Sequence, residues 1–586
     1  MSDLTDPEKP PHAIVKVLTD GRARRNDGTE LKAVCRNPWY VLATVHGEQG
    51  EDFDKNLHAR NRRIWNGWMC QEMAQVARAE LAERLGVDVR ELAPLAEVEE
   101  AHLRQVFANR LPNGTPPDPA DPVAFSSRYF ALRASFDGFH FPTSALFRSA
   151  AFGGDADFAS ASFGTDVSFA SAHFCGGAFF RSASFGGDVD FTFATFDDDA
   201  WFAETRFRAI AGFLSVSFLE DADFGSATFG GDTWFLSASF RKHANFASAS
   251  FGDDAWFRSA AFERRASFRS ASFAKGAEFN SASFGKDAGF ESASFGGNSN
   301  FESAVFSANA HFGSATFDGF VRFVSTSFEG DAVFDSVRFD GNAWFQKAAF
   351  GDLSVFDSVH FDWTADFSDG AFAAKTLFRN AVFARRAPEF YQRDVHQNTV
   401  FTLRPENWPA ITEKNADDSL RAYARLRHVM NELQKPDEEH FFFRQEMRCK
   451  ALTEDAPNNW LIAAFGVLAD YGISVTRPVA WLAALWAVAA YAYAAHVLPG
   501  CFAGLSDGLP EGAAGCAGGR GAALAHGAGL SFSSLFGFLG FSRLYFWEVL
   551  QALPAPLKVL AGFQTLAGVV LLFFLGLGLR TRFRLK

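Results

Sequence analysis

The residues that could do chemistry in this sequence are few, and they lie near its C-terminus. Ser533, Ser534, Gly537 and Gly540 occur in a stretch rich in aromatic residues, and Gln564 interrupts a long apolar segment. A polar group inside such a segment usually faces a bundle interior or a water-filled path. These five residues are therefore candidates for lining a pore. The alternative for Gln564 is a hydrogen bond between packed helices.

Signatures of catalysis and of metal binding are missing from the sequence. The 14 His are dispersed, none of the 6 Cys belongs to a CxxC pair, and no Walker loop or nucleophile elbow occurs. We therefore expect no catalytic residue, no metal and no cofactor, and predict that the chain is not an enzyme. Cys501 and Cys516 lie in a Gly-rich connection. If that connection is in an oxidising compartment, the pair is predicted to form a disulfide.

Two segments, 478–498 and 557–579, are apolar and long enough to cross a lipid bilayer. Arg477 precedes the first, and basic residues follow the second: Arg580, Arg582, Arg584 and Lys586. Because basic residues stay on the cytoplasmic side, both basic ends and the N-terminal soluble region are predicted to be cytoplasmic. We see no N-terminal signal peptide and predict location in a bacterial inner (cytoplasmic) membrane, with lipid as a partner.

A third apolar stretch, 530–550, lies between these two segments. It contains Arg543 and Glu548, which are costly deep in lipid, and a full crossing would place the C-terminal basic cluster outside. We therefore predict a re-entrant or interfacial helix here. Residues 460–468 similarly predict a short interfacial helix ahead of the first span.

Phenylalanine recurs at alternating gaps of five and six residues from Phe125 to Phe383, which gives a period of eleven. A small apolar residue, such as Ala156 before Phe158, stands two positions before most of these Phe residues. A fixed period of this length indicates a repeat architecture. The intervening Gly, Ser, Asp and Asn favour turns over helix, so Phe and the small residue should share the inner face of short strands.

The units Ala-Asp-Phe-Ala-Ser and Ala-Ser-Phe-Gly-Gly resemble those of the pentapeptide-repeat family across residues 121–385. The resemblance implies a mainly β solenoid, a right-handed quadrilateral β-helix. Here every second unit has six residues, so a coil should contain about 22 residues, with the extra residue at a corner such as Gly154-Asp155 or Gly187-Asp188. About twelve coils at roughly 4.8 Å each predict a rod about 57 Å long.

The net charge is −13, and most of the acidity lies in the repeats. An acidic surface does not attract a phosphate backbone, so nucleic acid is not an expected partner. One basic group interrupts this surface, and its members recur at about the length of one coil: Arg241, Lys242, Arg264, Arg265 and Lys286. These residues are a candidate docking patch for an acidic cytoplasmic protein, or they are simply solvated corner residues.

Four domains follow from these patterns. Residues 1–120 should form a helical N-terminal cap and linker, with 3–26 polar and mobile, helices within 57–85 and 89–111, and a cap over the open end of the solenoid. The β-helix follows at 121–385. Residues 386–455 should form a coupling region built on a helical hairpin, 419–433 and 438–452. Residues 456–586 should form the α-helical two-span membrane domain.

The order of span, re-entrant segment and span resembles two-helix ion-channel-like pore domains. The sequence departs from potassium channels, because Ser533 to Gly540 contains no Thr-Val-Gly-Tyr-Gly filter. One chain has too few spans to line a pore, so a channel would require a homo-oligomer. We weigh a solenoid coupled to such a pore-like domain against a membrane-tethered protein-interaction scaffold without conductance. A third hypothesis, an acidic DNA mimic acting on topoisomerase, is opposed by the membrane segments.

Overall fold

The computed structural model describes residues 13–50, 52–111, 114–502 and 519–583. The chain divides into two compact units, one ending at Ala410 and the other beginning at Ile411. The first unit is a β-solenoid with helices at its N-terminal end. The second unit is helical.

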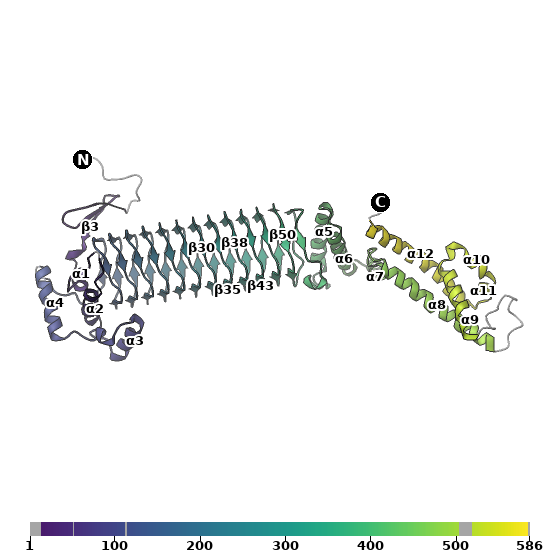
Figure 1. Cartoon of the computed structure of the whole chain (residues 1–586), viewed down its shortest axis with the longest axis horizontal. Coiled ribbons are helices and arrows are strands. Elements are labelled where there is room, and N and C mark those ends of the chain that lie inside the picture. The colour runs from purple at the N-terminus through teal and green to yellow at the C-terminus, as the bar shows by residue number, and fades with distance from the viewer. Residues whose placement is uncertain (1–12, 51, 112–113, 503–518, 584–586) are drawn as a thin grey trace. The chain divides into compact units, whose positions relative to one another are not determined.

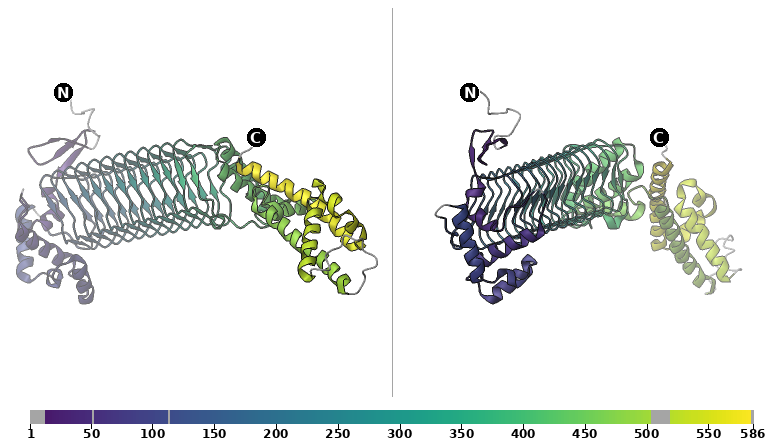
Figure 2. Two further views of the ribbon diagram at one scale, coloured as in Figure 1. Left: turned by 45° about the vertical axis from the view of Figure 1, so that its right-hand side comes forward. Right: turned by 60° about the vertical axis from the view of Figure 1, so that its left-hand side comes forward.

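The solenoid runs from β4 (Val123–Ala124) to β53 (Val400–Phe401), and most of its strands have two residues. Parallel pairing places Ala156 beside Ala178 and Asp157 beside Phe179 in the next coil, which confirms the coil length predicted from the sequence. The strands form four parallel sheets, of which two have 12 strands and one has 13. The fourth sheet is extended by three N-terminal strands to 16. Figure 2 shows the coils stacked on one another.

Phenylalanine rings fill the interior of the coils. Phe158 and Phe180, in successive coils, stack with ring centroids 5.0 Å apart and an interplanar angle of 5°. Phe158 also meets Phe169 edge to face at 5.4 Å. Ala156 and Phe158 are both fully buried, which confirms the predicted inward pair of small and large residues. Such ring pairs add about 0.5–1.5 kcal/mol each beyond burial of area.

The corners between strands are of two kinds. The five-residue units turn through a residue at positive φ, usually Ser: Ser160 has φ 52°, and Ala161 N donates to Phe158 O. The six-residue units hold the extra residue in a bend, as at residues 153–155. An Asp in this bend often accepts a hydrogen bond from the backbone of the next coil, as Asp166 does from Asp188 N at 3.0 Å. Part of the acidity is therefore structural.

Helices cover the N-terminal end of the solenoid, as predicted (Figure 2). They are α1 (Pro38–Ala43), α2 (Lys55–Met69), α3 (Gln75–Leu85) and α4 (Glu97–Arg110). Trp65 of α2 packs on Phe136, Phe139 and Phe141, and its Nε1 donates to His140 O at 2.8 Å. These contacts cover the rings of the first coil, which would otherwise be exposed to water.

The prediction that residues 3–26 are mobile is wrong for the described part of that segment; residues 1–12 lie outside the description. The strands β1 (Ile14–Val17), β2 (Ala23–Arg25) and β3 (Glu30–Ala33) extend a solenoid sheet. Ala23 and Leu31 share a buried cluster with Tyr129 and Ala151 of the solenoid. The segment has few apolar residues, and mobility was predicted for that reason. Its strands are nevertheless ordered, because the solenoid supplies most of the apolar surface against which they pack.

The solenoid also continues beyond the expected boundary at 385, to β53. The late Phe390 still stacks on Phe367 at 5.2 Å, and Trp408 then covers Phe383 at 5.1 Å. In this last part the guanidinium of Arg393 is buried and donates to the carbonyls of Phe345, Ala348 and Phe367. Burial lowers the pKa of Arg393 to about 9.

The second unit begins with the predicted hairpin, α5 (Ala416–Glu432) and α6 (Pro436–Thr453), followed by α7 (Asn458–Ala469). The two long apolar helices are α8 (Thr476–Phe502) and α12 (Ala555–Phe583). Between them lie α9 (Gly519–Leu535), η5 (Gly537–Leu539), α10 (Phe541–Tyr545) and α11 (Trp547–Ala552). The stretch 530–550 is therefore not one helix, because it is broken at Gly537 and at Gly540, whose φ is +78°.

The stacked core predicts a large penalty for removing one ring. Phe268 is fully buried between Phe246 and Phe290, each 4.9 Å away. Phe268→Ala should destabilise the solenoid by about 3–5 kcal/mol in chemical denaturation followed by circular dichroism. Phe193 is the matched control, because it is 57% exposed on a corner. An equal loss in Phe193→Ala and Phe268→Ala would contradict the inward stack.

A second prediction concerns pH. His140 is buried beneath α2, and burial lowers its pKa to about 4 from 6.5. The unfolded chain therefore binds a proton that the folded chain excludes, and stability falls as pH drops from about 6.5 through 4. Ser162 stands at the equivalent position in the next coil. The variant His140→Ser, which places the same residue type here, should abolish up to roughly 3 kcal/mol of this loss in stability at pH 4. Parallel pH profiles of the two proteins in thermal unfolding would contradict the assignment.

Candidate functional site

Residues 519–554, the described part of the chain between α8 and α12, form a hairpin that returns to the end at which α9 begins. Leu530 of α9 shares a buried cluster with Tyr493 and Ala561, whereas Leu535, further along α9, packs with Leu482 and Leu571. Thus α9 runs toward the start of α8 and the end of α12. Leu553, after α11, is back in the cluster of Leu530. The turn lies at Gly537–Gly540.

A buried polar network joins the three helices at mid-length. Tyr493 Oη on α8 donates to Gln564 Oε1 on α12 at 2.9 Å. Gln564 Nε2 donates to Ser531 Oγ on α9 at 2.8 Å, and Ser531 Oγ donates to Trp486 O on α8 at 2.9 Å. Gln564 is completely buried. Its amide is thus hydrogen-bonded between packed helices, the second of the two expected arrangements.

Glycines let these helices approach closely. A Cβ on Gly568 would lie 2.1 Å from Leu535 O, and one on Gly527 would lie 2.4 Å from Ala490 O. Gly568 therefore allows α12 to pack closely on α9. By contrast, Gly576 has nothing within 4 Å of its would-be Cβ. The α9 helix is therefore seated against both α8 and α12.

The other candidate pore residues divide into two groups. Ser533 and Ser534 are buried, and Ser534 O accepts a hydrogen bond from Thr565 Oγ1 at 2.8 Å. Gly537 lies against Thr565, while Gly540 is open. Beside them Phe538 and Leu539 are more than half exposed at the tip of the hairpin. The tip, and not the serines, is the accessible part.

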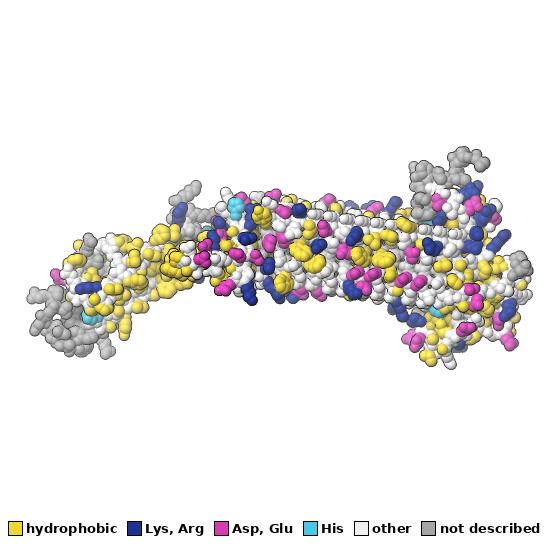
Figure 3. All heavy atoms as spheres, turned by 180° about the vertical axis from the view of Figure 1, so that it is seen from behind, with side chains coloured by type: hydrophobic (Ala, Val, Ile, Leu, Met, Phe, Trp, Pro, Cys, Tyr) yellow, Lys and Arg dark blue, Asp and Glu magenta, His cyan; other side chains and the backbone are white. Residues whose placement is uncertain are grey.

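The remaining sequence-predicted residues are partly placed. Cys516 lies outside the described residues, so the predicted disulfide with Cys501 stays a prediction. Lys242, Arg264 and Lys286 occupy the same position in three successive coils, whereas Arg241 and Arg265 lie in the adjacent positions. All five are exposed. Acidic residues are interspersed among them, and Lys242 approaches Glu220 at 3.8 Å. Figure 3 shows such mixing of charge along the solenoid.

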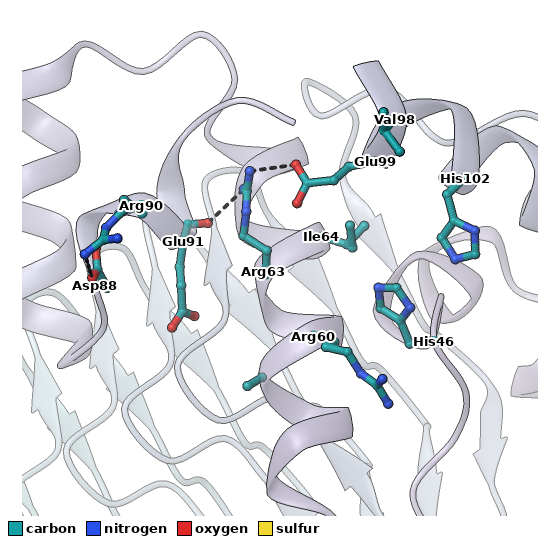
Figure 4. Close-up of a pocket in the computed structure, with 11 residues that line it drawn as sticks. His46, Arg60, Arg63, Ile64, Asp88, Arg90, Glu91, Val98, Glu99 and His102 are labelled. Atoms are coloured by element: carbon teal, nitrogen blue, oxygen red, sulfur yellow. Dashed lines mark hydrogen bonds and ion pairs between the residues drawn. The ribbon is translucent and has the colours of Figure 1, made fainter. Parts of the chain in front are cut away.

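A groove of about 650 Å³ lies among the N-terminal helices (Figure 4). Arg63 is held there by Glu99 at 2.9 Å and by backbone carbonyls. His46 and His102 stack at 5.2 Å. Burial, and then the neighbouring imidazole of His102, lowers the pKa of His46. The groove is charge-balanced, and we assign no ligand to it.

Sequence reasoning missed two sets of residues. Tyr493 and Ser531 complete the Gln564 network, but their spacing in the sequence carries no signal for that pairing. A second set, His173, Cys175 and Asp197, groups on the outer face of the solenoid. Cys175 and Asp197 are one coil apart in the sequence, and this spacing could have revealed their proximity. Burial opposes a charged His173, but hydrogen bonds to Asp197 and Cys175 prevail and raise its pKa to about 9.

The polar network predicts that Tyr493 and Gln564 are energetically coupled. Removing the hydroxyl in Tyr493→Phe should lower the stability of the second unit in detergent by about 0.6–2 kcal/mol. In the double variant, the losses of stability caused by Tyr493→Phe and by Gln564→Leu should not add, because each single variant already breaks the hydrogen bond between these two residues. Tyr491→Phe is the control, since Tyr491 is 71% exposed on the same helix. Full additivity in this double-mutant cycle would contradict the network.

No family model, curated protein or solved structure matches this chain.

Proposed function

We propose that α8 and α12 anchor the chain in a membrane. The observation that carries this proposal is the exposure of apolar side chains on both helices. Only 33% of the most apolar part of α8 and 22% of the most apolar part of α12 is buried, whereas a core helix of a soluble protein is mostly buried. Val488, Tyr491, Val559 and Leu566 are each at least two-thirds exposed. Lipid is the solvent that such surfaces require (Figure 3).

The orientation follows from the charges and the hairpin. Arg477 lies in the first turn of α8, and Arg580 and Arg582 lie in the last turn of α12. The hairpin geometry supports both of these ends lying on one side of the membrane. By the positive-inside rule this side is the cytoplasm of a bacterial inner membrane. The solenoid, which we propose belongs to the pentapeptide-repeat type, then extends into the cytoplasm. There its surface is available to a protein partner.

The re-entrant hairpin favours an oligomeric channel-like or pore-like function. In such domains a short helix enters between two spans and its tip faces the pore of a closed ring. Here α9 is that helix, and the exposed Phe538 and Leu539 at the tip are the candidate lining. The exposed faces of α8 and α12 supply surface for contact between subunits as well as for lipid.

A scaffold without conductance is the second candidate. It is favoured by the closure of the Gln564 network within one chain, which leaves this amide no role in a path between subunits. Neither proposal includes a catalytic activity. The DNA-mimic hypothesis is weakened further, because corner Asp residues such as Asp166 and Asp188 already hold the backbone of neighbouring coils.

Single-channel recording on the purified full chain in a planar bilayer tests the pore proposal. We expect an oligomer in detergent and discrete currents. In Leu539→Cys these currents should be blocked by a charged thiol reagent, because the residue lines the path. Tyr545→Cys is the control, since Tyr545 is more exposed than Leu539 (74% against 51%) but lies beyond the tip. The unmodified parent protein, treated with the same reagent, controls for its own thiols.

Two results would contradict the pore proposal. One is a monomer in detergent that passes no current at any voltage or with any ion. The other is equal block in Leu539→Cys and Tyr545→Cys. The first result would leave the membrane-anchored scaffold standing.

A further inference from the structure

We infer that His173, Cys175 and Asp197 form a binding site for a zinc-type divalent cation on the outer face of the solenoid. The three side chains offer one nitrogen, one sulfur and one oxygen ligand, and these atoms all lie within 4.8 Å of one another. Imidazole, thiolate and carboxylate are the ligands that zinc takes in proteins. The site does not depend on the proposed membrane function.

The backbone of two successive coils fixes the three residues. His173 lies in β13 (His173–Phe174), and Cys175 follows that strand directly. Asp197 occupies the same position one coil later, after β17 (Thr195–Phe196). Cys175 N donates to Phe152 O at 2.9 Å and Asp197 N donates to Phe174 O at 2.8 Å. The site is therefore built on the most regular part of the fold.

Two distances between ligand atoms can be compared with those of a tetrahedral centre, and each differs from them by roughly 0.5 Å. Bond lengths of about 2.0–2.3 Å place the ligand atoms of zinc roughly 3.3–3.6 Å apart. His173 Nε2 lies 2.7 Å from Asp197 Oδ2 and 3.9 Å from Cys175 Sγ. Side-chain movements of about 1 Å would admit the ion, which would replace the proton between His173 and Asp197.

The accessibility of the group suits a bound ion with an open position. His173 is 2% exposed, whereas the side chain of Asp197 is 34% exposed. A cation can therefore enter from the Asp197 side. Three protein ligands leave the fourth position for water or another ligand.

The identity of the three residues sets this site apart from the rest of the solenoid. The position of His173 holds Ala151 in the preceding coil and Thr195 in the next. The position of Cys175 is Gly153 one coil earlier, and that of Asp197 is Leu219 one coil later. The position of His173 holds small residues in most coils, whereas the position shared by Cys175 and Asp197 also holds Arg241, Glu263 and Glu329. The feature particular to these two coils is therefore the combination of an imidazole and a thiol with the carboxylate.

A thiol–imidazole dyad accounts less well for the geometry. Cys175 Sγ lies 3.8 Å from Nδ1 and 3.9 Å from Nε2 of His173, so neither nitrogen is singled out as its base. Arg25 is near enough to Cys175 for an electrostatic interaction, and its guanidinium donates to Ser149 O and Ser171 O. Cation binding would release the protons of His173 and Cys175, and the thiolate and the Asp197 carboxylate would then offset the two charges of the ion.

Cobalt titration of the tag-free full chain in detergent, after removal of metals with a chelator, tests the site. Co²⁺ is the probe because a Co²⁺–thiolate bond gives a near-ultraviolet charge-transfer band that nitrogen and oxygen ligands do not give. We expect this band to saturate at one equivalent and to disappear when Zn²⁺ is added. Full saturation only far above equimolar metal would overturn the proposal.

Three variants borrow the residue of a neighbouring coil, so that each should fold: His173→Thr, Cys175→Gly and Asp197→Leu. Each should weaken Co²⁺ binding by at least about 100-fold, since even loss of a supporting residue costs 10–100-fold. Cys175→Gly should also abolish the charge-transfer band. Unchanged circular dichroism would show that the solenoid is intact in each variant.

Cys35→Ser and His243→Ala are the matched controls, because Cys35 and His243 are exposed residues away from the site. Both should bind Co²⁺ like the parent protein. A parent chain without the band, or a band that survives in Cys175→Gly, would show that the three residues form only a buried ion pair beside a thiol.

Discussion

The stacking of phenylalanine rings along the axis of the solenoid is the interaction on which the first unit depends. Each ring must meet the ring of the next coil at about the spacing of paired strands, as Phe180 and Phe202 do at 4.7 Å. A residue added within a strand would move a ring out of this column. The requirement therefore keeps the coil length nearly constant. The coil from Phe367 to Phe390 is one residue longer, but the extra residue lies in the bend between Phe383 and Phe390 and the rings still stack. Variation is thus confined to the corners and to the outer face.

That constraint separates structure from function along the solenoid. The inward positions hold the Phe and Ala residues that form the core. Serines at positive φ form the turns, and aspartates at the corners accept hydrogen bonds between coils. What remains free to vary is a set of outward positions that recur once in each coil. Residues such as His173 and Cys175 differ from their neighbours in these positions, so they can be recognised as additions to the scaffold.

The sequence predicted the solenoid, its coil length and the two long apolar helices well, because a period and a run of apolar residues are local signals. It failed where the stabilising surface comes from elsewhere in the chain. The strands β1–β3 are short and polar, and they are ordered by Tyr129 and Ala151. Likewise, Gln564 could be singled out as a polar residue in an apolar helix. Its partners, Tyr493 and Ser531, could not be identified, because helix packing and not sequence spacing brings them together.

The central claim for the second unit is that the chain between α8 and α12 enters and leaves one side of a membrane. Side-specific labelling of single cysteines by an impermeant maleimide, in sealed vesicles of both orientations, tests it most directly. Cysteines replacing Glu454 and Arg582 should react from one side, and a cysteine replacing Gln551 should react from the other. Labelling of Glu454→Cys and Arg582→Cys from opposite sides would mean a third crossing and would contradict the account. Labelling of all three from one side would contradict it as well.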